Sequence, residues 1–382
     1  MPFSSLGLSE PLLSTLVSQK HIKPTPIQEQ AIPAVLANKD VLGIAKTGSG
    51  KTASYVLPIL TKLQTKRSSK NRHITALVMV PTRELAVQVN EVFRGFLNKL
   101  PQRVKTQAVF GGVSINPQMM AMQGVDVLVA TPGRLLDLVN SKAVHLSDIH
   151  TLVLDEADKM LNMGFADEMN QIFALLPKKR QNLLFSATLN QDVEAINQIL
   201  LHQPVVIQIA QEEGKDEIDL IEQRAYFISE EKKGPLLRYL ITEQKMKQVL
   251  VFTSSAKRAD AVANKLAKNG IDAKAIHSKK SMEYRTGALN SFKIGHLRVL
   301  VTTDLLSRGI DVQHLPYVVN YELPRSPKDY IHRIGRTGRS ESTGVAISLV
   351  TPSEEHHFSV IEKKMDRPVT RVDASDIDLH GF

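Results

Sequence analysis

The chain has 382 residues, 42% of them hydrophobic and 23% charged, which is typical of an ordinary soluble globular protein with room for two domains. Its net charge of +9 favours a polyanionic partner such as nucleic acid, although a generic basic protein has a similar charge. The lack of cysteine excludes disulfides, thiolate metal sites and cysteine nucleophiles. The N-terminus has no signal-peptide pattern, and no run of about 18 apolar residues occurs, so we expect no membrane span and a cytoplasmic location.

Short apolar runs alternate with helical periodicity through the first half of the chain, a pattern that predicts βα units and a mostly parallel sheet. The predicted strands of this half are Val41–Ala45, Ile74–Val80, Asp126–Ala130, Leu152–Leu154, Asn182–Phe185 and Val205–Ile209. Gln208–Leu220 then turns acidic and loses its periodicity, so we expect a linker there. The strands expected in the second half are Gln248–Phe252, Ala273–Ile276, Arg298–Val301, Val318–Tyr321 and Val345–Val350.

The predicted fold class is therefore α/β, with two domains of the same kind. We place the first domain at residues 1–208, the linker at 209–217, the second domain at 218–365 and a short polar tail at 366–382. In the second domain, the stretch SAKRADAVANKLAKNG has apolar residues at helical spacing and ends in Gly270. It predicts an amphipathic helix with a glycine C-cap.

A glycine-rich loop, AKTGSGKT, follows the first predicted strand and precedes a helical stretch. Gly48 and Gly50 let backbone amides converge on phosphate oxygens, as in nucleotide-binding P-loops. Lys51 is expected to reach the β and γ phosphates, and the Thr52 hydroxyl to ligate Mg²⁺. Ala45 replaces the first glycine of the strict pattern, and a turn that binds no nucleotide is the alternative. The expected nucleotide contacts of the loop are Thr47, Gly48, Ser49, Gly50, Lys51 and Thr52.

The stretch TLVLDEADKM places Asp155, Glu156 and Asp158 directly after a buried strand. Ligands of open α/β sheets bind at the carboxyl ends of the strands, and P-loop proteins hold Mg²⁺ with a carboxylate there. Asp155 is therefore expected to hold Mg²⁺, and Glu156 to orient and deprotonate the attacking water. For this stretch alone, an acidic helix start without a ligand is the alternative.

A third strand end, in LLFSATLN, carries Ser186 and Thr188 two positions apart. This spacing places both hydroxyls on the same side of an extended segment. A plain strand-to-turn transition is equally compatible with the pattern.

In the second half, YIHRIGRTGRS places His332, Arg336 and Arg339 at i, i+4 and i+7, which predicts one helical face. Arginines placed against a triphosphate stabilise charge in the transition state. Gly335 and Gly338 weaken a helix, so we expect them to permit the close approach of another surface. A solvated basic helix is the alternative.

An ordered series of motifs spans nearly the whole chain: PTPIQ (24–28), AKTGSGKT (45–52), PTRELA (81–86), GG (111–112), TPGR (131–134), DEAD (155–158), SAT (186–188), VFTSS (251–255), TTDLLSRGID (302–311) and HRIGRTGR (332–339). In this series the chain resembles the DEAD-box RNA helicases, superfamily 2 enzymes with two RecA-like domains. The stretch GGVSINPQMM and the short C-terminal tail look most like the bacterial RhlE-type group. The resemblance implies an ATP-binding domain at 1–208, a helicase domain at 218–365, and ATP and RNA sites at an interdomain cleft.

The resemblance also implies roles for the matching positions. Gln28 would read the adenine edge, Phe3 would support that pocket, and Asp311 would contact the ribose. Arg336 and Arg339 would act as arginine fingers. Coupling between the ATP site and the domain interface would come from Ser186, Thr188 and His332. The implied RNA contacts, made to the backbone and so independent of base sequence, are Arg83, Gly112, Thr131, Arg134, Arg285 and Thr303.

A few positions depart from the family pattern. Lys20 and His21 stand where a glycine and an aromatic residue are usual, which weakens the expected stacking on adenine. Lys46 replaces a glutamine of the phosphate loop, and Ser278 replaces a glycine. Met282 replaces a glutamine, which puts one RNA or interdomain contact in doubt.

The function implied is an ATP-dependent RNA helicase, an RNA-stimulated ATPase that uses Mg²⁺ and unwinds short RNA duplexes or remodels RNA–protein complexes. An ATP-gated RNA clamp with little unwinding is the alternative. A DNA helicase is a third option, because a basic cleft binds either backbone. We expect a monomer that binds RNA and no membrane, with proteins of ribosome assembly or RNA decay as the class of protein partner.

Overall fold

The computed structural model describes residues 2–45, 48–65, 71–209, 221–304, 315–338, 344–374 and 377–382. The chain splits into two compact units, Met1–Gln211 and Glu212–Phe382. Each unit has its own sheet and its own apolar core, so each is described by itself.

Unit 1 is built on a parallel sheet of seven described strands in the order β3-β4-β2-β5-β6-β1-β7. Its strands are β1 (Val41–Ile44), β2 (Ala76–Met79), β3 (Thr106–Val109), β4 (Val127–Ala130), β5 (Thr151–Asp155), β6 (Gln181–Ser186) and β7 (Val205–Gln208). Its helices are η1 (Phe3–Leu6), α1 (Glu10–Ser18), α2 (Pro26–Leu36), α3 (Lys51–Leu63), α4 (Arg83–Gly95), α5 (Asn116–Ala121), α6 (Pro132–Asn140), α7 (Ala157–Asn162), α8 (Ala166–Leu175) and α9 (Gln191–Leu200).

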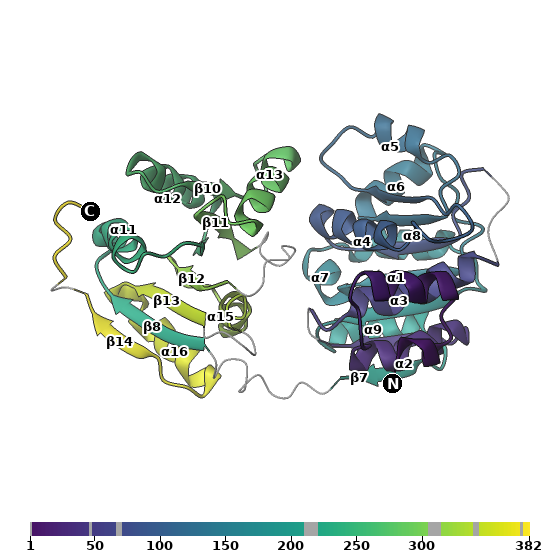
Figure 1. Ribbon diagram of the computed structural model, residues 1–382, viewed down its shortest axis with the longest axis horizontal. Helices are drawn as coiled ribbons and strands as arrows, with labels where there is room; N and C mark the ends of the chain where they lie inside the picture. The colour runs from purple at the N-terminus through teal and green to yellow at the C-terminus, as the bar shows by residue number, and fades with distance from the viewer. Residues whose placement is uncertain are drawn as a thin grey trace. The chain divides into compact units, whose positions relative to one another are not determined.

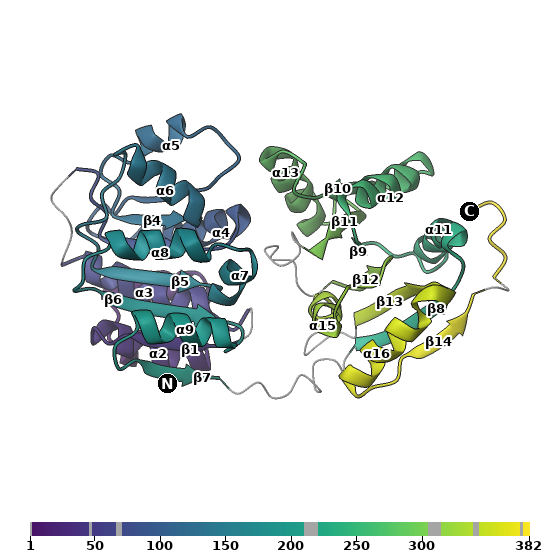
Figure 2. The same ribbon diagram turned by 180° about the vertical axis from the view of Figure 1, so that it is seen from behind.

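Helices cover both faces of the sheet of unit 1. Figure 1 shows α1 and α3 in front of the sheet, and Figure 2 shows α8 and α9 in front of the opposite face. Side chains of β5 alternate between the apolar clusters on the two faces of the sheet. Val153 packs with α2, α3 and α4, while Leu152 and Leu154 pack with α6, α8 and α9. A strand buried on both faces is continuously apolar, which is why the sequence shows β5 so clearly.

Unit 2 repeats this plan with a sheet of seven described strands in the order β10-β11-β9-β12-β13-β8-β14, again all parallel. Its strands are β8 (Ile221–Phe227), β9 (Val249–Thr253), β10 (Ala273–Ile276), β11 (Val299–Thr303), β12 (Tyr317–Asn320), β13 (Gly344–Val350) and β14 (Thr370–Asp373). Its helices are η2 (Glu230–Lys232), α11 (Lys233–Glu243), α12 (Ala256–Lys268), α13 (Met282–Lys293), α15 (Pro327–Ile334), η3 (Pro352–Glu354) and α16 (Glu355–Met365). Helices α11 and α12 pack on one face, and α13, α15 and α16 on the other.

The predicted α/β class and parallel sheets are confirmed, and every predicted strand is present with ends shifted by at most two residues. The predicted amphipathic helix is α12, with Gly270 just beyond it at a φ of 77°. Strands β3, β8 and β14 were not predicted. The expectation of a tail at 366–382 is wrong for Thr370–Asp373, because this segment pairs with β8 as an edge strand. Most of the expected linker lies outside the described residues.

Candidate functional site

The loop after β1 has the backbone that phosphate binding requires. Gly48 and Gly50 adopt φ values of 84° and 93°, a left-handed conformation that other residues rarely adopt. Helix α3 begins at Lys51, so its N-terminal amides and positive dipole end lie directly after this loop. Lys46 and Thr47 lie outside the described residues.

Gln28 ties the start of α2 to the same loop. Its Oε1 accepts a hydrogen bond from the Thr25 backbone amide at 3.0 Å, and its Nε2 donates to the Gly50 carbonyl at 3.2 Å. A Cβ on Gly50 would collide with this amide group, which is a second reason for glycine there. Gln28 thus lies against the phosphate loop with part of its hydrogen-bonding capacity already used, while Phe3 is buried in the apolar core beside α2.

Lys51 is buried at the start of α3, where its ammonium donates to the Ala45 carbonyl. Burial lowers the pKa of Lys51, while the charges of Asp155 and Glu156 oppose that shift. The ammonium therefore lies near the carboxylates but is hydrogen-bonded to a neutral acceptor, which a phosphate oxygen could replace.

Asp155 and Glu156 follow one another at the carboxyl end of β5. Burial raises the pKa of Asp155, and the Lys51 charge only partly opposes this. Burial also raises the pKa of Glu156, although Lys159 forms an ion pair with it at 2.7 Å. Glu156 has a φ of 55°, a left-handed conformation that costs about 1 kcal/mol or more in a residue other than glycine. This backbone turns the chain into α7, whose N-cap is Glu156.

Ser186 and Thr188 lie at the end of the neighbouring strand β6, where the chain bends. The Ser186 hydroxyl folds back to donate to the Thr188 carbonyl at 2.8 Å. The Thr188 hydroxyl donates to Oδ2 of Asp158 at 3.0 Å. The two hydroxyls therefore make different contacts in a turn, and the expected extended segment is wrong. Their contacts connect the end of β6 with the start of α7.

The residues of unit 1 predicted to bind RNA gather at the carboxyl ends of β2, β3 and β4. The Arg83 guanidinium lies against Gly112, with 3.5 Å between Nη1 and the Gly112 oxygen. A Cβ on Gly112 would overlap that guanidinium, and its φ of 76° also favours glycine. Arg134 donates to the Val113 carbonyl at 2.8 Å from α6, of which Thr131 is the N-cap. Two arginines thus hold the segment that follows β3.

In unit 2, the predicted helical face of His332, Arg336 and Arg339 is wrong. Helix α15 ends at Ile334, Gly335 is its C-cap, and Arg336 lies in the following turn. Thr337 bridges to Leu315 and donates its hydroxyl to the Leu315 carbonyl, which takes the chain off the helical path. Arg339 and Asp311 lie outside the described residues, whereas His332 is exposed on α15.

The expected role of the two glycines is partly different. Gly338 adopts a φ of 70°, so a left-handed turn accounts for it. A close approach also occurs there, because a Cβ on Gly344 would overlap Thr337 and the backbone nitrogen of Gly338. A Cβ on Gly335, in contrast, would come closest to the Ile331 carbonyl of its own helix. Of the two predicted RNA contacts of unit 2, Arg285 is buried on α13 and Thr303 ends β11.

Sequence reasoning missed two buried polar residues. Arg333 of α15 donates to both carboxylate oxygens of Asp304, at 2.6 and 2.8 Å, and lies over the ring of Phe252. Tyr55 of α3 donates to Asp155 at 2.7 Å. Tyr55 follows Thr52 by three positions on one helix face, which was the available indication. The sequence offers no comparable indication for Arg333.

A glycine loop at a helix start, a lysine and an acidic strand end at one edge of a parallel sheet define a P-loop nucleotide-binding protein. The sequence matches the family descriptions "DEAD/DEAH box helicase" over residues 25–196 and "Helicase conserved C-terminal domain" over residues 231–341. The described helices include none that is long and apolar enough to span a membrane.

Relatives support the same family over nearly the full length. The chain is 37% identical to a DEAD-box ATP-dependent RNA helicase CshA of Geobacillus kaustophilus, covering 98% of this chain and 79% of the relative. It is 40% identical to a DEAD-box ATP-dependent RNA helicase RhpA of Helicobacter pylori, covering 96% and 73%. The chain therefore belongs to the DEAD-box helicase family. The RhlE-type grouping stays a prediction, because these relatives carry other names.

Solved structures agree with this assignment. S. cerevisiae Dbp5 bound to RNA and ADP BeF3 matches with a TM-score of 0.83 at 32% identity, covering 98% of this chain and 96% of that one. A DEAD box protein from Methanococcus jannaschii matches with a TM-score of 0.54 at 33% identity, covering 98% and 99%. The two units are accordingly tandem RecA-like domains.

Proposed function

We propose that this chain is an RNA-stimulated ATPase that couples ATP hydrolysis to the unwinding or remodelling of short RNA duplexes and RNA–protein complexes. The observation that carries the proposal is the convergence of the glycine loop, Lys51 and the Asp155–Glu156 pair at one sheet edge of a DEAD-box protein. The family is one of ATP-dependent RNA helicases, so the chain is an enzyme and ATP is its nucleotide.

In the proposed site, Lys51 binds the β and γ phosphates and Glu156 acts as the base that orients the attacking water. The raised pKa of Glu156 suits a group that must accept a proton. Gln28 contacts the adenine, with Phe3 behind it.

The residues present fit Mg²⁺ as the bound cation. Thr52 and Asp155 offer one hydroxyl and one carboxylate, and hard cations prefer such oxygen donors. Among the described residues, no group of three or more His, Asp or Glu side chains is arranged to hold a metal ion. Mg²⁺ suits a sparse donor set, because it keeps several waters and takes other ligands from the phosphates. Bound there, it would neutralise phosphate charge.

Unit 2 is proposed to supply Arg336 and Arg339 to the transition state and Asp311 to the ribose. His332, Ser186 and Thr188 are proposed to couple nucleotide state to RNA binding. The hydrogen bond between Thr188 and Asp158 supports this coupling, since it connects the segment after β6 with the start of α7, beside Asp155 and Glu156.

RNA binding is proposed to depend on backbone contacts from both units. In unit 1 the contacts of Arg83 with Gly112, and of Arg134 with Val113, support a preformed surface. Thr131, Arg285 and Thr303 complete the proposed set. Because phosphate and sugar contacts carry no sequence information, the chain should act on RNA generally, as a cytoplasmic monomer that works with proteins of ribosome assembly or RNA decay.

The test measures ATP hydrolysis with RNA, with DNA of the same sequence and with neither, together with strand release from a short RNA duplex. The proposal predicts stimulation by RNA and ATP-dependent strand release. Equal stimulation by DNA would indicate a helicase that does not use the 2′-hydroxyl. RNA-stimulated hydrolysis without strand release from short duplexes would instead favour an ATP-gated clamp.

A further inference from the structure

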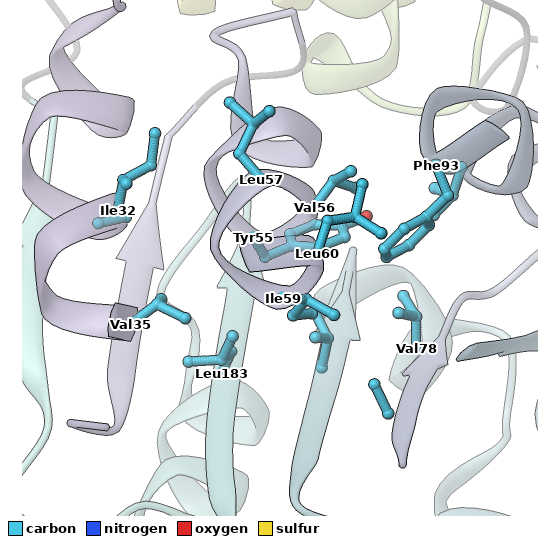
Figure 3. Close-up of a cluster of buried hydrophobic side chains, with 14 of the residues drawn as sticks. Ile32, Val35, Tyr55, Val56, Leu57, Ile59, Leu60, Val78, Phe93 and Leu183 are labelled. Carbon is cyan, nitrogen blue, oxygen red and sulfur yellow. The ribbon is translucent and has the colours of Figure 1, made fainter. Parts of the chain in front are cut away.

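Tyr55 is a polar residue in an apolar environment. Its side chain is fully buried on α3 and packs against the ring of Phe185, with 5.4 Å between the ring centroids. Figure 3 shows it among apolar side chains that include Val56, Leu60 and Phe93. A buried phenol hydroxyl without a hydrogen-bond partner costs free energy. The partners of this hydroxyl therefore indicate the role of Tyr55.

The hydroxyl is bonded to one of the two residues proposed to hold Mg²⁺. It donates to Oδ2 of Asp155 at 2.7 Å, while the other residue, Thr52, stands three positions before Tyr55 on the same helix. Thr52 lies in the first turn of α3 and Asp155 ends β5, about a hundred positions later in the sequence. A single buried phenol thus connects the two elements that carry the proposed metal ligands.

The chemistry of the two groups fixes the direction of the hydrogen bond. A phenol has one proton, and an ionised carboxylate can only accept, so the Tyr55 proton goes to Asp155. The bond is made to Oδ2, which leaves Oδ1 for another partner. A carboxylate oxygen is the kind of ligand that a divalent cation binds.

We propose that Tyr55 is a positioning residue of the metal–nucleotide site, which orients the Asp155 carboxylate for the cation and ties it to the helix that carries Thr52. The inference rests on the proposed function, in which those two residues hold Mg²⁺. Partners that orient metal ligands are commonly worth about 10- to 100-fold in metal affinity. A purely structural phenol would satisfy the buried carboxylate and leave metal affinity unchanged.

The test is Tyr55→Phe in the full-length chain, which keeps the buried ring and removes the hydroxyl. Binding of ADP is measured by calorimetry at 10 °C, once with Mg²⁺ and once with EDTA. The readout is the factor by which Mg²⁺ tightens ADP binding, so no turnover is needed. We expect that factor to fall by about 10-fold, while ADP affinity in EDTA stays unchanged.

Tyr330→Phe is the matched control. Tyr330 is equally buried, and its hydroxyl is bonded to Gln223 at 3.3 Å and Ser348 at 3.1 Å in unit 2. Tyr330→Phe removes the same hydroxyl group at a position far from the phosphate loop in the sequence. The factor by which Mg²⁺ tightens ADP binding should therefore equal that of the parent. Circular dichroism of both variants without ligand establishes that each is folded before binding is compared.

The outcomes separate this inference from the proposal beneath it. A Mg²⁺ factor in Tyr55→Phe equal to that of the parent overturns the positioning role, even if the variant unfolds at a lower temperature. If the parent itself shows no Mg²⁺ factor, or Asp155→Asn keeps the full factor, the proposed metal site fails instead.

Discussion

The two units share one topology but differ at the carboxyl ends of their strands. Strands β1 to β7 occupy the same successive places in their sheet as β8 to β14 do in theirs. After β1 the chain makes a loop with two glycines in left-handed conformations and enters α3 at Lys51. After the equivalent strand β8 it passes through a short turn, η2, and enters α11 at Lys233. The same scaffold thus presents a phosphate loop in one unit and a plain connection in the other.

The two lysines that open these helices show what the difference does. Lys233 is buried and forms an ion pair with Glu354 at 3.0 Å, and Glu230 lies 3.5 Å from it. Its charge is therefore neutralised within its own unit. Lys51 is also buried, but donates to a backbone carbonyl. A fold provides positions, and side chains at loop ends decide whether a position binds a ligand or stabilises the fold.

The largest expected effect comes from removing unit 2. The proposal places the phosphate loop and Glu156 in unit 1, and Arg336 and Arg339 in unit 2. Arginine fingers contribute roughly 10³–10⁵ in rate, so Met1–Gln211 alone should hydrolyse ATP at near-background rates. Steady-state hydrolysis with RNA, compared with the intact chain, checks this.

Mixing the separate units provides the control for that experiment. A covalent linker supplies an effective concentration in about the millimolar range, so mixing at micromolar levels should restore little activity. Hydrolysis by unit 1 alone at the rate of the intact chain would show that unit 2 has no catalytic part.

Glu156→Gln should give the next largest effect. Glutamine keeps the size and hydrogen bonding of the side chain but cannot accept the proton, and a general base contributes about 10²–10⁴ in rate. The variant should bind ATP and RNA and hold both without turnover. RNA release is followed by fluorescence anisotropy in the presence of ATP. Release as fast as from the parent would argue against Glu156 as the base.

Lys51→Ala and Lys233→Ala test the comparison of the two lysines directly. Loss of the Lys51 charge removes a preorganised phosphate contact, and we expect hydrolysis to fall about 10²–10³-fold with little change in stability. Lys233→Ala removes the cationic partner of Glu354 and should lower the free energy of unfolding of unit 2 by about 1–3 kcal/mol. The nucleotide affinity of the Lys233→Ala variant should match that of the parent. The same loss of nucleotide binding in both variants would contradict the distinction drawn here.

Much of this fold was visible in the sequence because its central strands are buried on both faces. Val41–Ile44 is a continuous apolar run for that reason, and Thr151–Asp155 contains one at Leu152–Leu154. Strands β3 and β14 lie at sheet edges, where Thr370–Asp373 has no fully buried side chain. Strand β8 alternates exposed and buried residues in its first half, so its composition resembles that of a loop.

The phosphate loop was predictable because glycines at left-handed positions are a local requirement. The path of the chain after Ile334 was not, because it depends on the contact of Thr337 with Leu315, 22 positions earlier in the sequence. Tyr55 illustrates the same limit. The spacing from Thr52 places Tyr55 on the right helix face, but its role depends on the hydrogen bond to the Asp155 carboxylate, 100 positions away, which no local pattern contains.

The smallest expected effect concerns stability against pH. Burial raises the pKa of Asp155, so the native state favours the protonated carboxyl more than the unfolded chain does. Stability of unit 1 is then lost as pH rises through the raised pKa. For Glu354, burial also favours the neutral form, but the Thr351 amide and Lys233 outweigh it and lower the pKa. Stability of unit 2 is instead lost as pH falls through that lowered pKa.

The two carboxylates should therefore respond in opposite ways to neutralisation. At pH 7 without ligand, Asp155→Asn removes an unfavourable buried charge and should raise the unfolding temperature of unit 1, although it removes a proposed metal ligand. Glu354→Gln at the same pH weakens the contact with Lys233 and should lower the unfolding temperature of unit 2. At about pH 4, where the unfolded chain is close to half protonated, both differences should shrink. Calorimetric scans of the full chain at the two pH values measure this. A lower unfolding temperature for Asp155→Asn than for the parent at pH 7 would show that the Asp155 charge stabilises unit 1, as the Glu354 charge stabilises unit 2. The opposite effects expected of the two carboxylates would then be contradicted.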